Sequence, residues 1–495
     1  MSVSFSNIPA NLRVPMFYAE VDNSQANSGS QTQRTLIIGQ MTKDGNGVAN
    51  IPVISGGVGD AKLKGGAGSM LHLLSVAYNA SDEFGEVWLL PLADAGQAVA
   101  AAGGIAVTAV PTAAGVIYLY IAGQRVTLSV AATDTAATIA AGLVAQINAT
   151  TLLPVTAKVA TADTGKVEIT AKNAGLAGNE IDMRLNYKGT ADGESTPAGL
   201  GLTLTPLSGG AVNPTLDDAL ANLGDKPFDF IVCPYSDSTS LDAVKDLLND
   251  STGRWSWANQ VYGHCFAAKS GSYATLATFG TTRNNQHESV IGVYDSPTPA
   301  WLWAADYAGA SASKLRADPG RPLQTVTLGY VMPPPHESRF ILRERNTLLW
   351  DGISTFDVGS DGTVALENVI TTYQKNGFGE ADDSYLEIES LFLLMYVLRK
   401  QKSVITSKFP RMKLGDDGGR YSPGSGVVTP KVIRAELVAC YQEMEEDGMV
   451  QDSAGFAAGL IVERDRTNPN RINVLWPGKL INQFRAMGLL AQFRL

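Results

Sequence analysis

The sequence predicts a multidomain protein of mixed α/β and α+β class. Its centre is a discontinuous, mainly parallel α/β sheet domain with an inserted β-rich domain, followed by an α+β C-terminal domain, with extended terminal arms. Three observations predict this fold. Short apolar runs alternate with helical patterns, a low-charge stretch of Ala, Thr and Gly divides these runs into two groups, and each end of the chain carries an apolar segment without a local partner.

The composition sets the size and class of the protein. The chain has 495 residues, of which 45% are hydrophobic and 17% charged, so it can bury a large core and is too long for one ordinary domain. The formal net charge of -10 argues against a protein that coats nucleic acid, because neutralising phosphates requires an excess of clustered Lys and Arg. We therefore expect two or three domains and no direct nucleic-acid partner.

Cysteine usage and apolar runs indicate the compartment. Cys233, Cys265 and Cys440 are odd in number, far apart and set in apolar stretches, so we expect buried thiols in a reducing compartment. The first residues lack the basic start and apolar run of a secretory signal. The apolar run at 391–398 is much shorter than the roughly 20 residues that span a bilayer. It predicts a core helix and no membrane insertion.

Residues 1–33 are the predicted N-terminal arm. They are rich in Ser, Asn, Gln and Pro, yet residues 12–21 are apolar and have nothing nearby to pack against. Pro15 lacks an N–H, which restricts this stretch to an edge or irregular pairing. We expect an arm that docks elsewhere. Its expected contact residues are Leu12, Val14, Phe17, Tyr18 and Val21.

The α/β domain is predicted in two parts, residues 34–96 and 211–337. In the first part, strands are expected at 34–39 and 86–92, with a helix at 69–80 between them. In the second part, helical stretches separate or follow three apolar runs; the strands are 228–235, 263–270 and 288–295, and the helices 241–248 and 299–315. Such alternation predicts a parallel sheet covered on both faces.

Residues 97–210 are predicted to be an inserted domain, because the α/β pattern resumes after them as though uninterrupted. A hairpin is expected over 116–130 around an Ala-Gly-Gln turn, and further strands at 166–171 and 179–187. Asp134 is expected to cap a helix. The buried face of that helix carries Ile139, Leu143 and Ile147.

Residues 338–478 are the predicted α+β C-terminal domain. Over 428–448, Thr429 is expected to cap a helix that begins at Pro430 and is terminated by Gly448. A hairpin over 459–476 turns at residues 468–470. The buried stripe of the helix is Ile433, Leu437, Cys440 and Met444.

Residues 479–495 are the predicted C-terminal arm. Apolar side chains occupy every second position near its end, which is the pattern of a strand. The strand is expected to run to the final residue. Its expected contact residues are Leu489, Ala491, Phe493 and Leu495.

A search for ligand-binding motifs finds none that is complete. Residues 65–70 are glycine-rich but lack the spacing and the Lys-Ser or Lys-Thr pair of a phosphate-binding loop, so we interpret them as a flexible entry to a helix. Residues 357–362 partly match a calcium loop, but Gly359 and Asn368 stand where ligands belong, so we expect a tight turn. The histidines lack neighbouring ligands for zinc; they are His72, His264, His287 and His336.

Charged and aromatic clusters give no active site either. The acidic groups at 416–417 and 445–447 are interpreted as turns and solvated faces. The pairs Trp255–Trp257 and Trp301–Trp303 are interpreted as packing residues. We expect no catalytic residue, no cofactor and no metal. Two interpretations remain open for three basic residues beside an apolar segment: they lie in a solvated loop, or they form a contact surface. These residues are Lys408, Arg411 and Lys413.

Many ordered segments of this sequence resemble one known family. In the C-terminal third they are NTLLWDGIST, ENVITTYQKNGFGEADDSYLEIESL, KFPRMKLGDDG, VVTPKVIRAELVACYQEMEEDGMVQ, LIVERDRTNPNRINVLWP and LINQFR. Near the N-terminus they are VSFSNIP, LRVPMFYAEVDNSQANSG and GSMLHLLSVAYNASDEFGEVWLLPLAD. Over essentially the whole chain these segments resemble the contractile tail sheath protein of Mu-like bacteriophages. The final MGLLAQFRL is less uniformly apolar than the family pattern.

The resemblance implies a structural subunit that is not an enzyme. It implies hexameric rings stacked helically around a tail tube, which contract and drive the tube through the host envelope during genome ejection. The arms would complete sheets in neighbouring subunits, the inserted domain would face outward, and Lys408, Arg411 and Lys413 would be candidates for facing the tube. The implied partners are other copies of the chain and the tail tube, baseplate and tail terminator proteins. The implied location is the virion tail, assembled in the bacterial host cytoplasm.

Two other hypotheses remain open at this point. A doubly wound α/β enzyme would need convergent polar groups at the carboxyl ends of the strands, and the sequence offers no adequate set. The sheath of a bacteriocin or secretion-type contractile injection system would share the fold and the contraction but not the viral setting. Neighbouring genes discriminate here, because capsid genes beside tube, tape-measure and baseplate genes indicate a phage.

Overall fold

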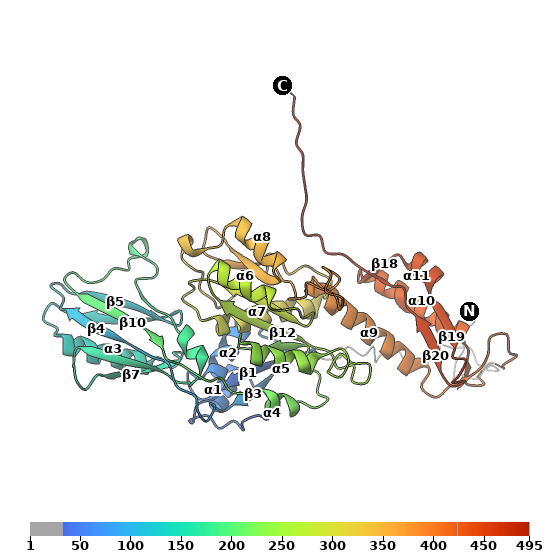
Figure 1. The fold of residues 1–495 in the computed structure, drawn as a ribbon, viewed down its shortest axis with the longest axis horizontal. Helices are drawn as coiled ribbons and strands as arrows, with labels where there is room; N and C mark the ends of the chain where they lie inside the picture. Colours follow the sequence, from blue (N-terminus) through green and yellow to red (C-terminus); the bar gives the residue numbers. More distant parts are fainter. Residues whose placement is uncertain (1–32, 423, 495) are drawn as a thin grey trace, which may run out of the picture. The chain divides into compact units, whose positions relative to one another are not determined.

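The computed structural model describes residues 33–422 and 424–494 (Figure 1). Contacts divide the chain into two compact units. The first, called here the α/β unit, contains residues 33–392 and 483–494. The second, called the C-terminal unit, contains residues 393–482.

A sheet of eight strands forms the centre of the α/β unit, in the order β15-β14-β13-β12-β11-β1-β3-β2. The strands from β14 to β3 run parallel, and β2 and β15 pair antiparallel at the two edges. The sheet is therefore mainly parallel, as the alternation of apolar runs predicts. The strands are β1 (Arg34–Gln40), β2 (Val53–Ile54), β3 (Glu86–Leu92), β11 (Phe230–Val232), β12 (His264–Ser270), β13 (Glu288–Val293), β14 (Ile353–Val358) and β15 (Val364–Asn368).

Both faces of this sheet are covered. Every residue of β13 is buried, and so is every residue of β1 after Arg34. Successive side chains of a strand point to opposite faces, so this pattern requires cover on both. Helices α2 (Met70–Asn79) and α7 (Ala300–Ala317) pack side by side, with α2 on β1 and α7 on β11 and β12. The other helices of the unit are α1 (Val58–Gly65), α4 (Asp217–Ala221), α5 (Ser238–Leu248), α6 (Tyr273–Thr281) and α8 (Leu342–Trp350).

The sheet continues past residue 338, where the C-terminal domain is predicted to begin. β14 pairs in parallel with β13 through Val290 and Ile353, and β15 turns back on β14. The rings of Phe356 in β14 and Trp303 in α7 lie with centroids 4.6 Å apart. Apolar packing across the expected boundary therefore holds β14 on the sheet. The division into compact units falls between residues 392 and 393.

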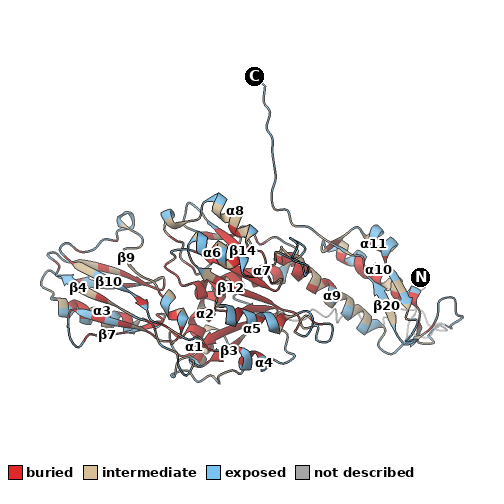
Figure 2. Ribbon diagram, viewed as in Figure 1, coloured by how far each residue is buried: buried red, intermediate tan, exposed pale blue. Residues whose placement is uncertain are grey.

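Residues 102–208 fold into two antiparallel sheets and one helix around a core of their own (Figure 2). The sheets have the orders β10-β4-β8-β7 and β6-β5-β9. Helix α3 (Ala136–Ala149) buries the predicted Ile139, Leu143 and Ile147 against them. The strands are β4 (Ala102–Ala109), β5 (Gly115–Ile121), β6 (Gln124–Val130), β7 (Val155–Val159), β8 (Lys166–Ala171), β9 (Met183–Leu185) and β10 (Gly201–Ser208).

Thr135, and not the predicted Asp134, caps α3. The Thr135 hydroxyl accepts a hydrogen bond from the backbone N–H of Thr138 at 3.2 Å, and the Thr138 hydroxyl accepts one from the Thr135 N–H at 2.9 Å. Asp134 instead closes the preceding turn by accepting from the Ala131 N–H at 2.7 Å. The reciprocal Thr135–Thr138 pair provides acceptors for two backbone N–H groups at the helix end, and therefore Thr135 is the cap.

The C-terminal unit is built on α9 (Ile388–Lys408) and α10 (Pro430–Glu446). As predicted, Ile433, Leu437, Cys440 and Met444 form the buried stripe of α10. Thr429 occupies the cap position, but its side chain makes no capping hydrogen bond. The other elements are α11 (Ser453–Gly459), β16 (Lys413–Leu414), β17 (Val427–Val428), β18 (Val450–Gln451), β19 (Ile461–Arg464), β20 (Ile472–Leu475) and β21 (Lys479–Leu480).

The three cysteines are free and buried, as predicted. Burial raises the pKa of the Cys440 thiol to about 11. A hydrogen bond with Cys233, together with burial, raises the pKa of Cys265 well above its usual value. The apolar run at 391–398 lies within α9. Among the residues that the structure describes, no helix has the length and apolar character to cross a membrane.

Gly309 lets α7 approach α2 closely. A Cβ atom at this position would lie 2.5 Å from the carbonyl oxygen of Tyr78. We expect Gly309→Ala to lower the free energy of unfolding by about 1–3 kcal/mol, because the two helices must move apart. The matched control is Gly59→Ala in α1, where a Cβ meets no atom within 4 Å; this change should be neutral or stabilise by up to about 1 kcal/mol. Thermal unfolding compares the two, and equal midpoints would contradict the close contact.

Candidate assembly interface

The carboxyl edge of the parallel sheet is where an α/β enzyme would bind its ligand, at the point where the strand order reverses. That point is at β1, which has β3 on one side and β11 on the other. Gln40 at the end of β1 donates to Asp94 at 2.6 Å and to the Ala174 carbonyl at 2.7 Å, and accepts from the Tyr235 hydroxyl at 3.1 Å. Asn173 donates to the Met41 carbonyl at 3.0 Å. The inserted residues 173–174 therefore occupy this edge.

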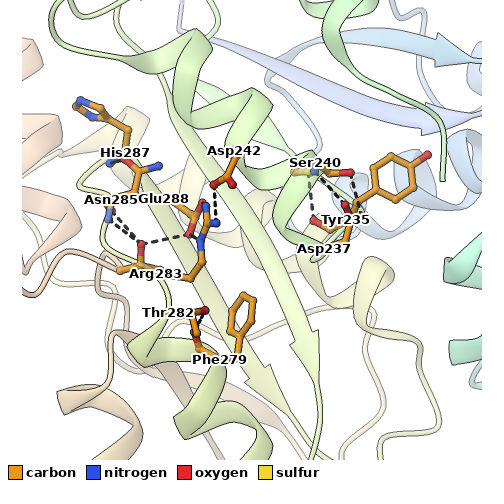
Figure 3. Close-up of polar contacts among 12 residues, drawn as sticks. Tyr235, Asp237, Ser240, Asp242, Phe279, Thr282, Arg283, Asn285, His287 and Glu288 are labelled. Carbon is orange, nitrogen blue, oxygen red and sulfur yellow. Dashed lines mark hydrogen bonds and ion pairs between the residues drawn. The ribbon is translucent and has the colours of Figure 1, made fainter. Parts of the chain in front are cut away.

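A small hollow remains beside these contacts, and its polar groups already have structural roles. Asp237 caps α5 by accepting from the Ser240 N–H at 3.0 Å (Figure 3), and it also accepts from Asn213 at 2.9 Å. Burial raises the pKa of Glu180 to about 7, and the nearby Lys269 opposes this shift. Asp237 therefore already serves as a helix cap and as an acceptor for Asn213.

Figure 3 also shows a buried ion-pair cluster at the opposite, amino end of β13. Arg283 donates two hydrogen bonds to Glu288, at 3.0 and 2.7 Å, and a third to Asp242 of α5 at 2.7 Å. The Arg283 and Glu288 side chains are almost fully buried. A buried charge is tolerated when its partner compensates it, as here. We interpret the cluster as a tie between α5 and β13.

Three of the four histidines, His72, His264 and His287, are buried, and His336 is exposed. Burial lowers the pKa of His72 to about 4. His264 lies 2.9 Å from the Ser289 hydroxyl, and His287 lies 2.7 Å from Asp250. In the described parts of the chain, no three His, Cys, Asp or Glu side chains gather into a possible metal site.

The motifs singled out in the sequence are structural. The turn at 357–362 joins β14 to β15, and Asp361 accepts from the Thr363 N–H at 3.0 Å. In the glycine-rich stretch, Ser69 caps α2 by accepting from the His72 N–H at 3.1 Å. Trp301 and Trp303 are buried within α7. Trp255 stacks on His287 with ring centroids 4.4 Å apart, whereas Trp257 is exposed.

The C-terminal arm does not form the predicted strand within the single chain. β21 pairs with β18, and residues 481–494 have neither helix nor strand. The Leu489 and Phe493 side chains are 79% and 85% exposed, and Ala491 is exposed too. A strand needs a partner for its backbone groups, and the described residues supply none here. Pairing with another subunit stays a prediction, and Leu495 lies outside the described residues.

The N-terminal arm cannot be compared in the same way. Its predicted contact residues all lie outside the described residues: Leu12, Val14, Phe17, Tyr18 and Val21. Their role therefore stays a prediction.

A two-stranded hairpin offers open edges in the C-terminal unit. β19 and β20 pair antiparallel, with Val462 opposite Val474, and no third strand joins them in the described chain. Ile461 and Leu475 are 51% and 61% exposed. Unpaired edges next to exposed apolar side chains are templates for a further strand. This hairpin is therefore the candidate acceptor for an arm.

Aromatic packing holds the base of this hairpin. The Tyr441 and Phe456 rings stack with centroids 3.8 Å apart, and Trp476, directly after β20, packs against both. The Tyr441 hydroxyl donates to the Gln451 carbonyl at 2.7 Å and accepts from the Lys479 N–H at 2.9 Å. The hairpin is thus fixed to α10 at its base, while its strands remain accessible.

The three basic candidates for the tube-facing surface are all exposed, at or near the end of α9. Lys408 forms an ion pair with Glu436 of α10. Arg411 and Lys413 have no ion pair within the described chain. Within the described chain, Arg411 and Lys413 are therefore the members of this group whose positive charge is not neutralised by an ion pair. Their contact with a tube stays a prediction.

Sequence reasoning missed two residues of this interface. Asp465 holds the hairpin turn by accepting from the N–H groups of Thr467 and Asn468, both at 2.8 Å. The Asp-Arg-Thr-Asn order carries a recognisable turn signal. Arg485 in the C-terminal arm contacts Glu387 and Glu389. Those partners lie almost a hundred positions away, so no local pattern reveals them.

Comparison with known proteins gives a consistent result. The family model described as phage tail sheath protein central domain matches residues 209–372, and that of the phage tail sheath C-terminal domain matches residues 380–494. The Mu-like prophage FluMu tail sheath protein of Haemophilus influenzae is 40% identical over 495 residues, with 100% of each chain covered.

Solved structures of sheath tail proteins show weaker likeness. The protein from Listeria innocua is 15% identical with a TM-score of 0.49, covering 93% of this chain and 95% of that one. The protein from Desulfitobacterium hafniense is 14% identical with a TM-score of 0.48, covering 95% and 97%.

We expect Asp465→Ala to loosen the hairpin. The Asp465 carboxylate accepts hydrogen bonds from two backbone N–H groups and from the Asn473 side chain at 2.8 Å. These hydrogen bonds, above all the one from the Asn468 N–H, hold the pKa of Asp465 well below its usual value. Hydrogen exchange over 461–475 should therefore be faster in the variant at neutral pH. The matched control is Asp361→Ala, which removes a similar turn between β14 and β15. Unchanged exchange in the Asp465 variant would show that the turn holds without this carboxylate.

Proposed function

This chain belongs to the phage tail sheath protein family, and from this premise we propose that its copies assemble as hexameric rings stacked around a tail tube. Contraction of that sheath then drives the tube through the host envelope during genome ejection. The observation that carries the proposal is that one chain contains both an open hairpin, β19–β20, and an exposed apolar arm, neither of which has a further strand partner among the described residues. Tail sheath proteins are structural and not enzymes, which agrees with the use of the sheet's carboxyl edge for internal contacts.

The proposed link between subunits is β-augmentation. In this mode an extended segment adds a strand to an exposed edge, and backbone hydrogen bonds join the chains. The C-terminal arm of one copy would pair with the β19–β20 hairpin of another through Leu489, Ala491, Phe493 and Leu495. The N-terminal arm would make a second link of the same kind. Links of this type allow subunits to rotate as rigid blocks while they stay joined.

Contraction in this proposal draws on the assembly itself. Many small differences in contact energy between the extended and contracted arrangements add up over many copies, so no nucleotide is needed. The inserted residues 97–210 would face outward. The tube would lie against the C-terminal region, and the baseplate and tail terminator proteins would meet the two ends of the sheath. Assembly would take place in the bacterial host cytoplasm.

We expect the purified protein to form tubes or sheath fragments that are visible by electron microscopy. Deleting residues 1–33 should leave a folded, soluble protein that no longer polymerises, because the apolar arm that joins subunits is gone. Circular dichroism and thermal unfolding serve as the control for folding. Regular tubes from the truncated chain would contradict a linking role for this arm, and monomers that turn over a metabolite would contradict the proposed function itself.

The basic group should contribute to sheath–tube contact. Exposed charges contribute little individually, so we expect single changes to be silent and Arg411→Glu combined with Lys413→Glu to reduce co-sedimentation with purified tube several-fold at low salt. Adding Lys408→Glu should have a smaller further effect, because Glu436 already pairs with Lys408. The control pair, Lys43→Glu with Lys245→Glu, changes the same charge on exposed residues of the α/β unit. Equal co-sedimentation across a range of salt would remove this surface from consideration.

A further inference from the structure

Phe484 and Arg485 of the C-terminal arm are attached to the α/β unit of their own subunit. Gln324 donates to the Phe484 carbonyl at 3.2 Å. The Arg485 Nη2 atom contacts two carboxylates, those of Glu387 and Glu389, the second at 2.7 Å. After Arg485 the arm has no further element of secondary structure, and its end is marked C in Figure 1. Arg485 is thus the last anchored point before the exposed apolar residues.

The two glutamates are held rigidly. The Glu389 side chain is completely buried, and its other interaction is a hydrogen bond from the Leu323 N–H at 2.8 Å. Glu387 forms a backbone bridge with Ile370, at the start of α9. The Glu389 carboxylate therefore has a fixed position on the α/β unit, and Glu387 is held there through its backbone.

The contact also ties Arg485 to a single position. Its Nε and Nη1 atoms are buried without a hydrogen-bond partner in the described chain, so the guanidinium depends on the two carboxylates. Without Arg485, two like charges would share a largely buried site, which is unfavourable. The arrangement is therefore stable only when all three side chains are present.

We propose that Arg485, Glu387 and Glu389 form a clamp that fixes where the C-terminal arm leaves its own subunit, so that residues 486–495 are the part that reaches a second copy of the chain. The inference rests on the proposed β-augmentation by this arm. It adds that the pairing register of the arm is counted from Arg485. Arg485 is therefore a positioning residue.

A fixed origin determines what the arm can reach and how it arrives. The ten residues after Arg485 span at most about 33 Å, at about 3.3 Å per extended residue. The acceptor edge must lie within that distance of the clamp. Counting from the clamp also sets which side of the strand Leu489, Ala491 and Phe493 occupy, because a shift of one residue turns every side chain to the other face.

The test compares two insertions of one Gly, before and after the clamp. Asn482 is exposed and precedes the anchored residues, so an extra residue after it can be absorbed without moving the arm beyond Arg485. An insertion after Gly488 shifts the register of the distal residues. We expect the first variant to polymerise within about twofold of the wild type, and the second to lose about tenfold or more in sedimentable tubes.

The outcomes separate the clamp from the proposed function. Equal impairment by both insertions would overturn the clamp as the origin of register while leaving arm pairing intact. Wild-type polymerisation by both would overturn arm pairing as well. In an Arg485→Ala background, the proposal requires that the two insertions no longer differ.

A second set of variants tests the ion pairs directly. Arg485→Ala should reduce polymerisation and speed hydrogen exchange at the Leu323 N–H in the unassembled subunit, because the Glu389 carboxylate is released. A single nitrogen of Arg485 contacts both carboxylates, so Arg485→Lys should restore much of both properties. The matched control is Arg494→Ala, which removes an exposed arginine from the same arm. Equal effects of the Arg485 and Arg494 changes on polymerisation would overturn the clamp.

Discussion

The organisation of this molecule depends on one constraint: the backbone N–H and C=O groups at strand edges need hydrogen-bond partners, and the described part of one chain does not supply all of them. The large parallel sheet is closed at its edges: β2 has only two residues, and the segment near Thr327 pairs with Ala365 along β15. Among the described residues, no strand or bridge covers the edges of the hairpin β19–β20. Edge strands that stay open invite pairing with other chains, and natural proteins normally block them. The contrast within a single chain indicates where self-association is permitted.

Hydrogen bonds within the subunit also occupy the place where a doubly wound sheet can bind a ligand. In a doubly wound sheet the strand reversal creates a crevice that can bind a ligand. In this chain the side-chain amides of Gln40 and Asn173 donate hydrogen bonds across that crevice to other parts of the subunit. The sheet and the inserted segment are thereby joined into one body. A subunit that moves as a block within an assembly benefits from such rigidity.

The elements that could be predicted from the sequence are those whose signals are local. The buried strands β1 and β13 follow from unbroken apolar runs, and the stripe from Ile433 to Met444 follows from helical spacing. The sequence predicts the cap of α3 one residue too early, because Asp134 and Thr135 are both good caps and only the turn geometry distinguishes them.

Features that depend on distant or absent partners could not be predicted. Alternation near Leu489 has the pattern of a strand, but a strand forms only when another chain supplies its hydrogen bonds. Arg485 is one arginine among many until the fold brings Glu387 and Glu389 to it. The extension of the sheet by β14 depends likewise on the packing of Phe356 against Trp303. In a phage tail, the buried thiols have a further consequence: the thiolate is the form that oxidises, and burial raises the pKa of the Cys440 thiol to about 11. Because all three thiols are also buried, they are shielded from contact with the thiols of neighbouring subunits, so a virion in aerated surroundings should not become cross-linked between its subunits.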